Sequence, residues 1–298
     1  MRAATLLLAL LLAGCSALFL HPSERMVRDP AQIGLRYEDV RLAAPDGAVL
    51  RGWYLPAATP ARGTVLHLHG NAENISTFIG AVHWLPARGY NVLLLDYRGF
   101  GESGGEPSIE HVNEDARVAL DWLLARPGPD SERLVVFGQS LGGSVAIYAV
   151  AHHPQRERVR AVISEGAFSS YSRIAREKMA AFWLTWPLQW PLSLLFSDRY
   201  AAERAAPLLD PVPLLIMHGE QDPVVPVTHS RRLFDAAKGP RELWTQPGGH
   251  IEALTHPEGR ERFAAYLDRY TGAVSAAAAS SRPGAAGSPA GLPASPRR

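Results

Sequence analysis

The chain has 298 residues, of which 47% are hydrophobic and 20% are charged, a balance typical of a globular domain with a full core. The formal net charge of +1 implies neither the basic surface of a nucleic-acid-binding protein nor an acidic partner. Cys15 is the single cysteine, so no internal disulfide can form, and the sequence has no Cys/His cluster of the zinc-binding type.

The N-terminus has the pattern of a targeting segment. Arg2 precedes an apolar run over residues 3–13, which is short for a membrane span and has the positive flank of a signal peptide. The run leads into the sequence LAGC at residues 12–15, followed by Ser16, which resembles the lipobox of bacterial lipoproteins. This resemblance implies a signal peptide over residues 1–14 and a lipid anchor on Cys15. The protein would then be a bacterial membrane-anchored lipoprotein, periplasm-facing or in the outer membrane, which Ser16 favours. The alternative is an uncleaved N-terminal helix that also tethers the chain.

The rest of the chain alternates between apolar runs and amphipathic stretches. Residues 15–32 are expected to be a linker, and residues 33–271 a single folded domain. Residues 35–43 and 49–55 flank a Pro-Asp-Gly turn and predict a β-hairpin. The alternation that follows predicts an α/β fold, with a mostly parallel sheet covered by helices on both faces. The expected strands are 64–70, 92–96, 133–137, 159–164, 214–218 and 242–245, and the expected helices are 74–88, 109–125, 228–237 and 258–270.

Two segments depart from this alternation. Residues 167–211 lie between two predicted strands and are too long for a structureless loop. Their middle holds three of the seven tryptophans, and Pro187 and Pro191 interrupt any long helix. We interpret the segment as a lid of short helices over the active site; the alternatives are an ordinary packed excursion, or an aromatic surface that also rests on a membrane interface. Residues 272–298 are rich in Ala, Ser, Pro and Gly and are expected to be a disordered tail.

The sequence GQSLG at residues 138–142 fits the nucleophile elbow G-x-S-x-G, with a predicted strand before it and a small-residue helix after it. Gly138 and Gly142 suit this sharp turn because a Cβ at either position would crowd the neighbouring strand and helix. Ser140 is therefore the candidate nucleophile, at a helix N-terminus that favours developing negative charge. The alternative is a tight strand-to-helix turn in which the serine only caps the helix.

A serine nucleophile needs a base, and the base needs a third group to orient it. In enzymes with this elbow the acid and the histidine follow the serine along the chain. Asp222 follows a predicted strand, and His250 lies in a glycine-containing loop 28 residues later, which makes them the candidate acid and base. Glu165 is the alternative acid and His256 the alternative base. Asp210 precedes its strand and would face the wrong edge of the sheet.

An oxyanion formed at the serine needs two main-chain N–H donors. One is the N–H of Leu141, and the other comes from the loop after the strand at residues 64–70, where we favour Asn71 over Ala72. His69 is expected to support this loop.

The glycine-rich turn that begins at Asp96 is expected to have a structural role. Asp96 and Arg98 are interpreted as an ion pair or hydrogen-bond clamp in this turn, with direct substrate contact as the alternative. The turn lacks the G-x-G-x-x-G spacing of a dinucleotide site.

Four motifs together resemble the α/β-hydrolase superfamily, and within it a group of membrane-tethered serine hydrolases. They are HGNxEN at residues 69–74, DYRGFGxS at 96–103, GxSLGG at 138–143 and HGxxDxxVP at 218–226. The resemblance covers about residues 33–270 and implies the α/β-hydrolase fold, with Ser140 as nucleophile, Asp222 as acid and His250 as base. Some members of this group are depalmitoylases or lipases; the Trp-rich segment departs from the group in composition.

These observations predict a serine hydrolase that cleaves carboxylic esters or thioesters of a small-molecule or acylated substrate. The chemistry requires no metal and no organic cofactor. A peptidase or amidase is an alternative, since the same triad serves both reactions. A hypothesis from another class is a lipoprotein of this fold that only binds lipid or a partner.

Overall fold

The computed structural model of the protein describes residues 19–127, 129–181 and 183–272. The predicted signal peptide, the lipidation site at Cys15 and the predicted tail beyond Gly272 lie outside these residues.

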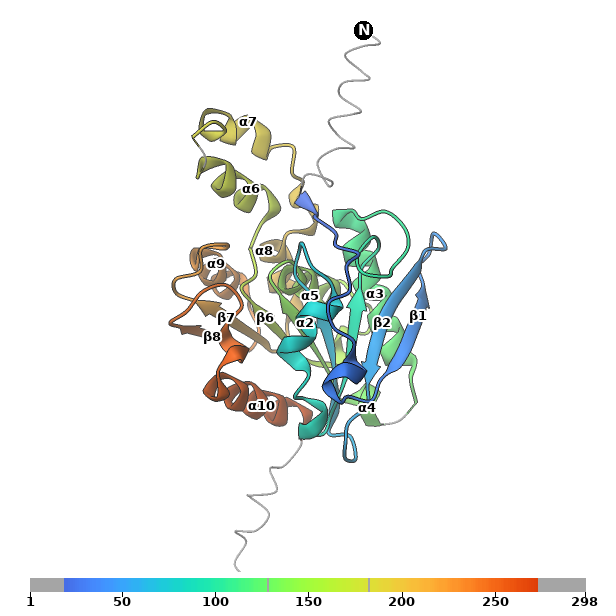
Figure 1. The fold of residues 1–298 in the computed structure, drawn as a ribbon. Helices are drawn as coiled ribbons and strands as arrows, with labels where there is room; N and C mark the ends of the chain where they lie inside the picture. Colours follow the sequence, from blue (N-terminus) through green and yellow to red (C-terminus); the bar gives the residue numbers. More distant parts are fainter. Residues whose placement is uncertain (1–18, 128, 182, 273–298) are drawn as a thin grey trace, which may run out of the picture.

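Eight strands form one sheet at the centre of the molecule (Figure 1). The strands are β1 (Glu38–Ala43), β2 (Val49–Leu55), β3 (Gly63–Leu68), β4 (Tyr90–Asp96), β5 (Leu134–Gln139), β6 (Val159–Glu165), β7 (Leu214–Gly219) and β8 (Arg241–Gln246). Their spatial order is β1-β2-β4-β3-β5-β6-β7-β8. The hairpin β1–β2 is antiparallel and joins β4 antiparallel, whereas all later pairs are parallel. The predicted fold class and the hairpin are confirmed.

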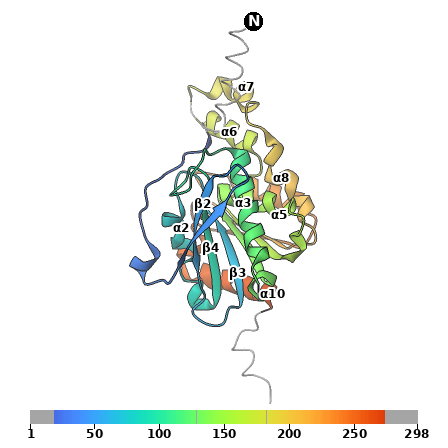
Figure 2. The same ribbon diagram turned by 90° about the vertical axis from the view of Figure 1, so that its right-hand side faces the viewer.

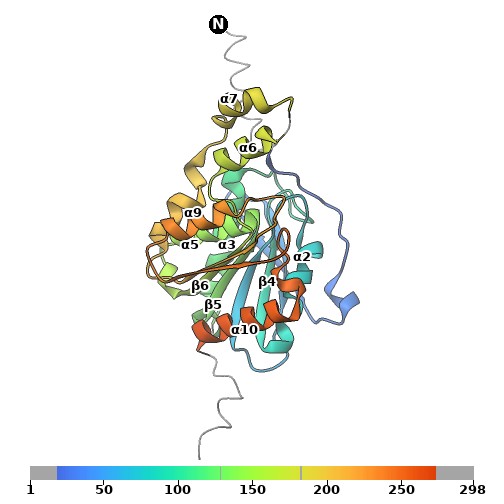
Figure 3. The same ribbon diagram turned by 90° about the vertical axis from the view of Figure 1, so that its left-hand side faces the viewer.

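Helices cover both faces of the sheet (Figures 2 and 3). The α-helices are α2 (Ile75–Val82), α3 (Ile109–Ala125), α4 (Pro129–Glu132), α5 (Leu141–Ala151), α6 (Tyr171–Ala180), α7 (Gln189–Ser193), α8 (Ala202–Ala205), α9 (Thr228–Ala236) and α10 (Pro257–Thr271). The 3₁₀ turns are η1 (Pro30–Ile33), η2 (Pro86–Arg88), η3 (Arg156–Arg158), η4 (Trp186–Leu188), η5 (Asp198–Tyr200), η6 (Ala206–Leu209) and η7 (Ala253–Thr255).

The core consists of two buried apolar clusters, one on each face of the sheet. Leu134 and Val136 of β5 belong to the cluster that contains α3, α5, α8 and α9. Val135 and Phe137 belong to the cluster that contains α2 and α10. Because both faces of β5 are buried, the strand reads as a continuous apolar run, which places the following turn firmly at the sheet's carboxyl edge.

The predicted helix over residues 74–88 is shorter in the structure. It begins after Asn74, whose side chain accepts a hydrogen bond from the N–H of Ser76, and it ends at Val82. Pro86 then opens the separate turn η2. A proline inside a helix removes one hydrogen bond and its ring clashes with the preceding turn, so the chain stops the helix before it.

The predicted lid contains short helices, as expected, but it ends earlier than predicted. Elements α6, η4, α7 and η5 stand above the carboxyl edge of the sheet (Figure 1). Elements α8 and η6, also expected in the lid, pack against α5 in the main core, where Ala202, Ala205, Ala206 and Leu209 are almost completely buried. Small alanine side chains let this segment approach α5 closely, so it belongs to the body of the domain.

The linker expected at residues 15–32 is also different, because its described part is fixed to the domain. We call residues 19–29 the N-terminal strap. Leu20 is 2% exposed. The side-chain amide of Asn74 donates to the main-chain carbonyls of Ser23 and Arg25, at 2.9 and 3.0 Å, and the N–H of Val27 donates to Ser76. These bonds join side chains of the domain to main-chain groups of the strap, so they depend little on which residues the strap contains. For that reason the composition of the segment predicts a polar linker instead.

Candidate functional site

Ser140 lies on a strained turn between β5 and α5. Its φ of 54° and ψ of −117° place a non-glycine residue in a sparsely populated conformation, which costs about 1–3 kcal/mol. A Cβ on Gly138 would lie 2.0 Å from the carbonyl oxygen of Gly142, and one on Gly142 would lie 2.0 Å from that of Leu68. The close approach of strand and helix that the motif predicts is therefore present. It leaves no room for a Cβ at either glycine.

The candidate acid and base are hydrogen-bonded to each other. Nδ1 of His250 lies 2.7 Å from Oδ2 of Asp222. The other carboxylate oxygen, Oδ1, accepts the main-chain N–H groups of Val224 and Val225 at 2.7 and 2.8 Å. Because an ionised carboxylate only accepts hydrogen bonds, Nδ1 of His250 must carry the proton, and Nε2 is left with its lone pair. This is the tautomer that a general base requires.

The charge state of Asp222 follows from its partners. Burial opposes ionisation of the carboxyl group, but hydrogen bonds from His218 and His250 and from the N–H of Val225 outweigh it. Together they hold the pKa of Asp222 well below its usual range. Asp222 is therefore an anion at neutral pH, able to stabilise positive charge on the imidazole of His250.

The loops that carry Asp222 and His250 are held together by their main chains. The two loops follow the adjacent parallel strands β7 and β8. The N–H of Gln221 donates to the carbonyl of Gly248 at 3.1 Å, and the N–H of Gly248 donates to the side chain of Gln221 at 2.7 Å. A Cβ on Gly219 would lie 2.1 Å from the carbonyl oxygen of Gly249, so the approach requires glycine at position 219.

The end of β6 links Ser140 to His250. The main-chain N–H of Ser140 donates to the carbonyl of Glu165 at 2.8 Å. The next residue, Gly166, packs against the imidazole, because a Cβ there would lie 3.1 Å from Cε1 of His250. Within the described ranges no hydrogen bond joins the Ser140 hydroxyl to the His250 ring. Such bonds are often long in ligand-free enzymes and tighten when substrate binds.

The rival acid and base are placed elsewhere. Glu165 is completely buried, where it accepts hydrogen bonds from Gln139 and from the N–H of Ala253, and burial raises its pKa. It joins the side chain of Gln139 to the main chain of Ala253. His256 is exposed at the start of α10, and Asp210 is exposed before β7. Of the candidate acids, Asp222 is the one hydrogen-bonded to His250.

The expected oxyanion donors lie on either side of Ser140. Leu141 is the first residue of α5, so its N–H is not used by the hydrogen-bond ladder of the helix. The N–H of Ala72 is already bonded to the side-chain oxygen of Asn71 at 2.9 Å, which favours the main chain of Asn71 as the second donor. A Cβ on Gly70 would lie 3.2 Å from Cβ of Ser140, so this loop is adjacent to the serine.

The side chain of Asn71 connects this loop to the N-terminal strap. Its amide nitrogen donates to the carbonyl of Phe19 at 2.6 Å, and its oxygen accepts the N–H of His21 at 2.9 Å. No pattern in the sequence predicts this contact, because it joins two segments about fifty residues apart.

The expected ion pair between Asp96 and Arg98 is not formed. Arg98 is completely buried and pairs with Asp115, with Nε 2.8 Å from Oδ1. Asp96 instead accepts the N–H of Ile75 at 2.8 Å and lies 3.4 Å from Nε2 of His69. Both residues are structural clamps, as expected, but with different partners. Burial raises the pKa of Asp96 to about 7 and lowers that of His69 to about 3.

Ser140 opens into a cavity of about 490 Å³ beneath the lid. Its wall is mostly apolar and comes from the strap, the lid and the loop after Asp222. The described lining residues are Phe19, His21, Asn71, Ser140, Leu141, Phe168, Ile174, Ala175, Lys178, Met179, Leu192, Leu195, Phe196, Val224 and Val225. Such a wall suits an acyl chain.

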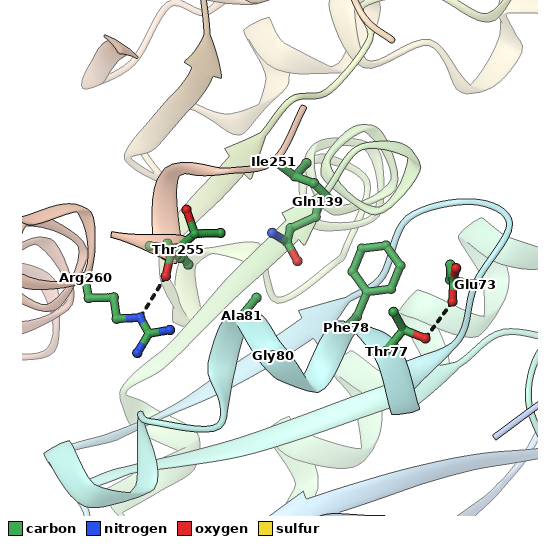
Figure 4. Close-up of a pocket in the computed structure, with 10 residues that line it drawn as sticks. Glu73, Thr77, Phe78, Gly80, Ala81, Gln139, Ile251, Thr255 and Arg260 are labelled. Carbon is green, nitrogen blue, oxygen red and sulfur yellow. Dashed lines mark hydrogen bonds between the residues drawn. The ribbon is translucent and has the colours of Figure 1, made fainter. Parts of the chain in front are cut away.

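A second cavity, of about 270 Å³, lies between α2 and the segment around η7 (Figure 4). Phe78 and Ala81 line it from α2, and Gln139 and Ile251 line it beside the candidate site. Ile251 has a φ of 52°, a strained value for a β-branched residue. Within the described ranges, no three His, Cys, Asp or Glu side chains are grouped so that they could hold a metal ion.

Two features of the site were not assigned from sequence. His218 contacts the candidate acid, and its place in the motif HGxxDxxVP was the available signal. Phe19 and His21 line the cavity from a segment expected to be a linker, and the only signal there was the apolar pair at residues 19 and 20.

Comparisons with known proteins identify the family. The sequence model of the family Hydrolase_4, described as "Serine aminopeptidase, S33", matches residues 59–206. Uncharacterized protein YfhR of Escherichia coli strain K12 is 38% identical over 227 residues, which cover 74% of this chain and 76% of that protein. Alpha/beta hydrolase domain-containing protein WAV2 of Arabidopsis thaliana is 34% identical over 224 residues, 71% of each chain. The chain belongs to the α/β-hydrolase superfamily.

Solved structures agree with this α/β hydrolase in fold. The Pyrococcus furiosus esterase Pf2001 is 22% identical, with a TM-score of 0.69 over 85% of this chain and 98% of the esterase. Acetyl xylan esterase 1 from Thermoanaerobacterium sp. JW/SL YS485 is 19% identical, with a TM-score of 0.62 over 82% and 86% of the two chains. At these identities the likeness establishes the fold alone. The finer resemblance to the membrane-tethered group stays a prediction.

Proposed function

We propose that this α/β hydrolase cleaves carboxylic esters or thioesters with an apolar acyl part, through a Ser140–His250–Asp222 triad. The observation that carries the proposal is that the elbow serine opens into an apolar cavity beside a hydrogen-bonded His–Asp pair. Each residue then has a role that its surroundings support.

In the acylation step, Nε2 of His250 takes the hydroxyl proton of Ser140 while the serine oxygen attacks the substrate carbonyl carbon. The carbonyl oxygen becomes an oxyanion, which accepts hydrogen bonds from the N–H groups of Leu141 and Asn71. Asp222 stabilises the imidazolium of His250. His250 then gives the proton to the leaving oxygen or sulfur, and the acyl group stays on Ser140.

In the deacylation step, water takes the place of the leaving group. His250 removes a proton from the water, the hydroxide attacks the acyl carbon, and the second oxyanion collapses to release the carboxylic acid. His250 returns the proton to Ser140, which restores the starting enzyme. Every proton in this scheme passes through the imidazole of His250. The ionised carboxylate of Asp222 stabilises the positive charge that this imidazole carries in each step.

A fluorophosphonate probe and p-nitrophenyl esters test the proposal. We expect the folded protein to be labelled by the probe and to hydrolyse esters, with a preference for acyl chains long enough to fill the cavity. Ser140→Ala should abolish both. Absence of labelling in the folded wild-type protein would instead support the lipoprotein that only binds lipid or a partner.

The family description favours a second candidate, a serine aminopeptidase. An aminopeptidase binds the free amino group of its substrate, for which a carboxylate is the natural partner. The described residues that line the cavity include Lys178 but no carboxylate, which favours the ester or thioester. A panel of aminoacyl-p-nitroanilides beside the esters separates the two activities.

We further propose that the chain is a bacterial lipoprotein anchored at Cys15, facing the periplasm from the inner or outer membrane. The support is the lipobox-like sequence at residues 12–15. Metabolic labelling with an alkyne fatty acid should mark the wild-type chain but not Cys15→Ser. Equal labelling of both chains would contradict an anchor at this residue.

A further inference from the structure

The outer side of the lid exposes large apolar side chains. We call Trp183, Leu184, Trp186, Leu188, Trp190 and Leu194 the lid patch. Their exposed fractions run from 51% for Leu188 to 82% for Leu194. Single exposed apolar residues are common on soluble domains, but a group of six within twelve residues marks an interaction surface.

The lid patch has the composition of a segment that lies on a membrane. Residues 179–197 contain no charged residue. The segment is divided into the short elements η4 and α7, and no helix in the described ranges is both long enough and apolar enough to cross a bilayer. Tryptophan is favoured at the boundary between lipid headgroups and acyl chains, so three tryptophans on one exposed segment suit that boundary.

The charges around the lid patch favour an anionic lipid surface. The guanidinium of Arg176 stacks on the ring of Trp190, 4.3 Å from its centroid. The acidic side chains nearby are bonded within the protein: Glu177 accepts from His229 at 2.8 Å, and Asp198 accepts from the N–H of Ser172 at 3.1 Å. Residues 171–200 contain four arginine or lysine side chains against these two acidic ones, and an excess of cations beside an apolar patch adds electrostatic attraction to anionic headgroups.

The N-terminal strap begins at the same end of the molecule as the lid (Figures 1 and 2). The ring of Phe19 packs against Tyr171 and Phe196 of the lid segment, with centroids 5.3 and 6.1 Å apart. Cys15 precedes Phe19 by four residues, which even fully extended span only about 14 Å. Any membrane anchor at or before Cys15 is therefore tied to the end of the protein that carries the lid patch.

The inner side of the lid faces the candidate site. Ile174 and Met179 of α6, together with Leu192 and Phe196, line the cavity that contains Ser140. Helix α7 therefore carries both a residue of the cavity wall, Leu192, and a residue of the lid patch, Trp190.

From these observations we propose that the lid patch docks on the lipid bilayer and that the cavity draws the acyl chain of its substrate from that bilayer. The docking part is independent of the triad, whereas the substrate part rests on the proposed esterase or thioesterase function. A protein partner and a second copy of the chain are the competing occupants of the lid patch.

Fluorescence quenching by lipids with brominated acyl chains tests the docking. The full chain is reconstituted in vesicles of brominated phosphatidylethanolamine and phosphatidylglycerol. It is compared with the triple variant Trp183→Ser, Trp186→Ser, Trp190→Ser, which keeps four tryptophans elsewhere in the domain. We expect strong quenching of the wild type and loss of most of that quenching in the variant. The emission of the remaining tryptophans in lipid-free buffer reports whether the variant is folded.

The control is Leu208→Ser, which removes a side chain that is 50% exposed outside the lid patch and should leave the quenching unchanged. Because the N-terminal anchor is present in every variant, anchoring alone predicts equal quenching in all three proteins, and that result would overturn the proposal. A lid patch covered by a second copy or a protein partner predicts unquenched wild type, which would also overturn it.

Activity then tests the route of the substrate. The triple variant should hydrolyse a soluble short-chain ester at the wild-type rate but lose hydrolysis of a long-chain ester embedded in vesicles. Equal rates on the vesicle ester would overturn the substrate part. If the proposed function is wrong, Ser140→Ala leaves the hydrolysis unchanged. The quenching result does not depend on Ser140, so it still decides whether the lid patch docks on the bilayer.

Discussion

Nε2 of His218 lies 3.3 Å from Oδ2 of Asp222, the same oxygen that His250 contacts. His218 is fixed in place by two further bonds: Nε2 lies 2.8 Å from the carbonyl of Val225, and Nδ1 lies 2.6 Å from the hydroxyl of Ser230. Since a carbonyl only accepts, Nε2 of His218 carries the proton and is shared between Val225 and Asp222. His218 is therefore a positioning residue for the candidate acid.

Replacement of His218 should lower turnover without affecting substrate binding. We expect His218→Phe to reduce kcat by about 10–100-fold, the loss that follows removal of a hydrogen-bond partner from a metal ligand, because His218 holds Asp222 in a comparable way. His218→Gln, which keeps an N–H donor, should recover part of the loss. Steady-state kinetics on a p-nitrophenyl ester measure both, and the exposed His256→Gln serves as the control. A wild-type kcat in His218→Phe would show that Asp222 is held well enough without it.

Asp222→Asn should inactivate the enzyme while leaving the fold intact. The N–H groups of Val224 and Val225 would hold the amide oxygen at the position of Oδ1, so the amide NH₂ would face Nδ1 of His250. That arrangement favours the tautomer with its proton on Nε2, which cannot accept the proton of Ser140. In a serine protease the same change lowers kcat by about 10⁴-fold, and we expect a similar loss here. Asp210→Asn, at an exposed carboxylate, should keep wild-type activity, and circular dichroism checks both folds.

Asp96→Asn should remove a pH dependence of stability. Burial raises the pKa of Asp96 from 3.8 to about 7, so between these values the folded protein holds a proton that the unfolded chain has lost. The free energy of unfolding therefore falls as pH rises from about 4 to about 7, and this group accounts for ~2–3 kcal/mol of loss between pH 5 and pH 8. Asparagine keeps the acceptor for the N–H of Ile75 and has no charge.

Urea unfolding at pH 5 and pH 8 measures the effect. The wild type should lose more stability between the two pH values than Asp96→Asn does, and Asp39→Asn, at an exposed carboxylate, should behave like the wild type. If the wild type and Asp96→Asn lose the same amount, then Asp96 is ionised in the fold at both pH values.

Two glycine substitutions should change stability in opposite directions. Gly142→Ala places a Cβ 2.0 Å from the carbonyl oxygen of Leu68, so the elbow must open, at about 1–3 kcal/mol or more. Gly80→Ala lies inside α2, where the new Cβ would have no atom within 4 Å apart from the helix's own backbone and the adjoining residues, and should stabilise the protein by about 0.5–1 kcal/mol. Thermal unfolding of both variants tests the pair. Destabilisation by Gly80→Ala would mean that α2 is not a regular helix at this position.

The features that were predictable from sequence are those fixed by local pattern. The apolar run of β5 is continuous because both of its faces are buried, and the glycines of GQSLG follow from crowding within five residues. Pro86, by contrast, stood in the sequence as a clear helix breaker, and the expected helix over residues 74–88 gave it too little weight.

The features that were missed depend on contacts between distant residues. Arg98 pairs with Asp115, on a helix seventeen residues away, because that helix packs beside the glycine-rich turn. The sequence offered Asp96 as the nearer partner, but its carboxylate faces the start of α2. Residues 202–209 are predicted as part of the lid because they belong to the long segment between two predicted strands, and the small size of their alanines, which lets them pack on α5, is not a signal that sequence alone makes clear. Partner choice of this kind is set by tertiary packing.

The N-terminal strap changes where a working fragment of this protein has to start. A recombinant fragment that starts at residue 33, where the sequence pattern of the domain begins, would remove Phe19 and His21 from the cavity wall. It would also leave the side chains of Asn71 and Asn74 without their main-chain partners in the strap. Since the folded body begins only four residues after Cys15, no long flexible tether separates the two. If Cys15 carries the proposed lipid anchor, the height of the domain above the membrane is set by the position of the strap in the fold, and hardly at all by spacer length.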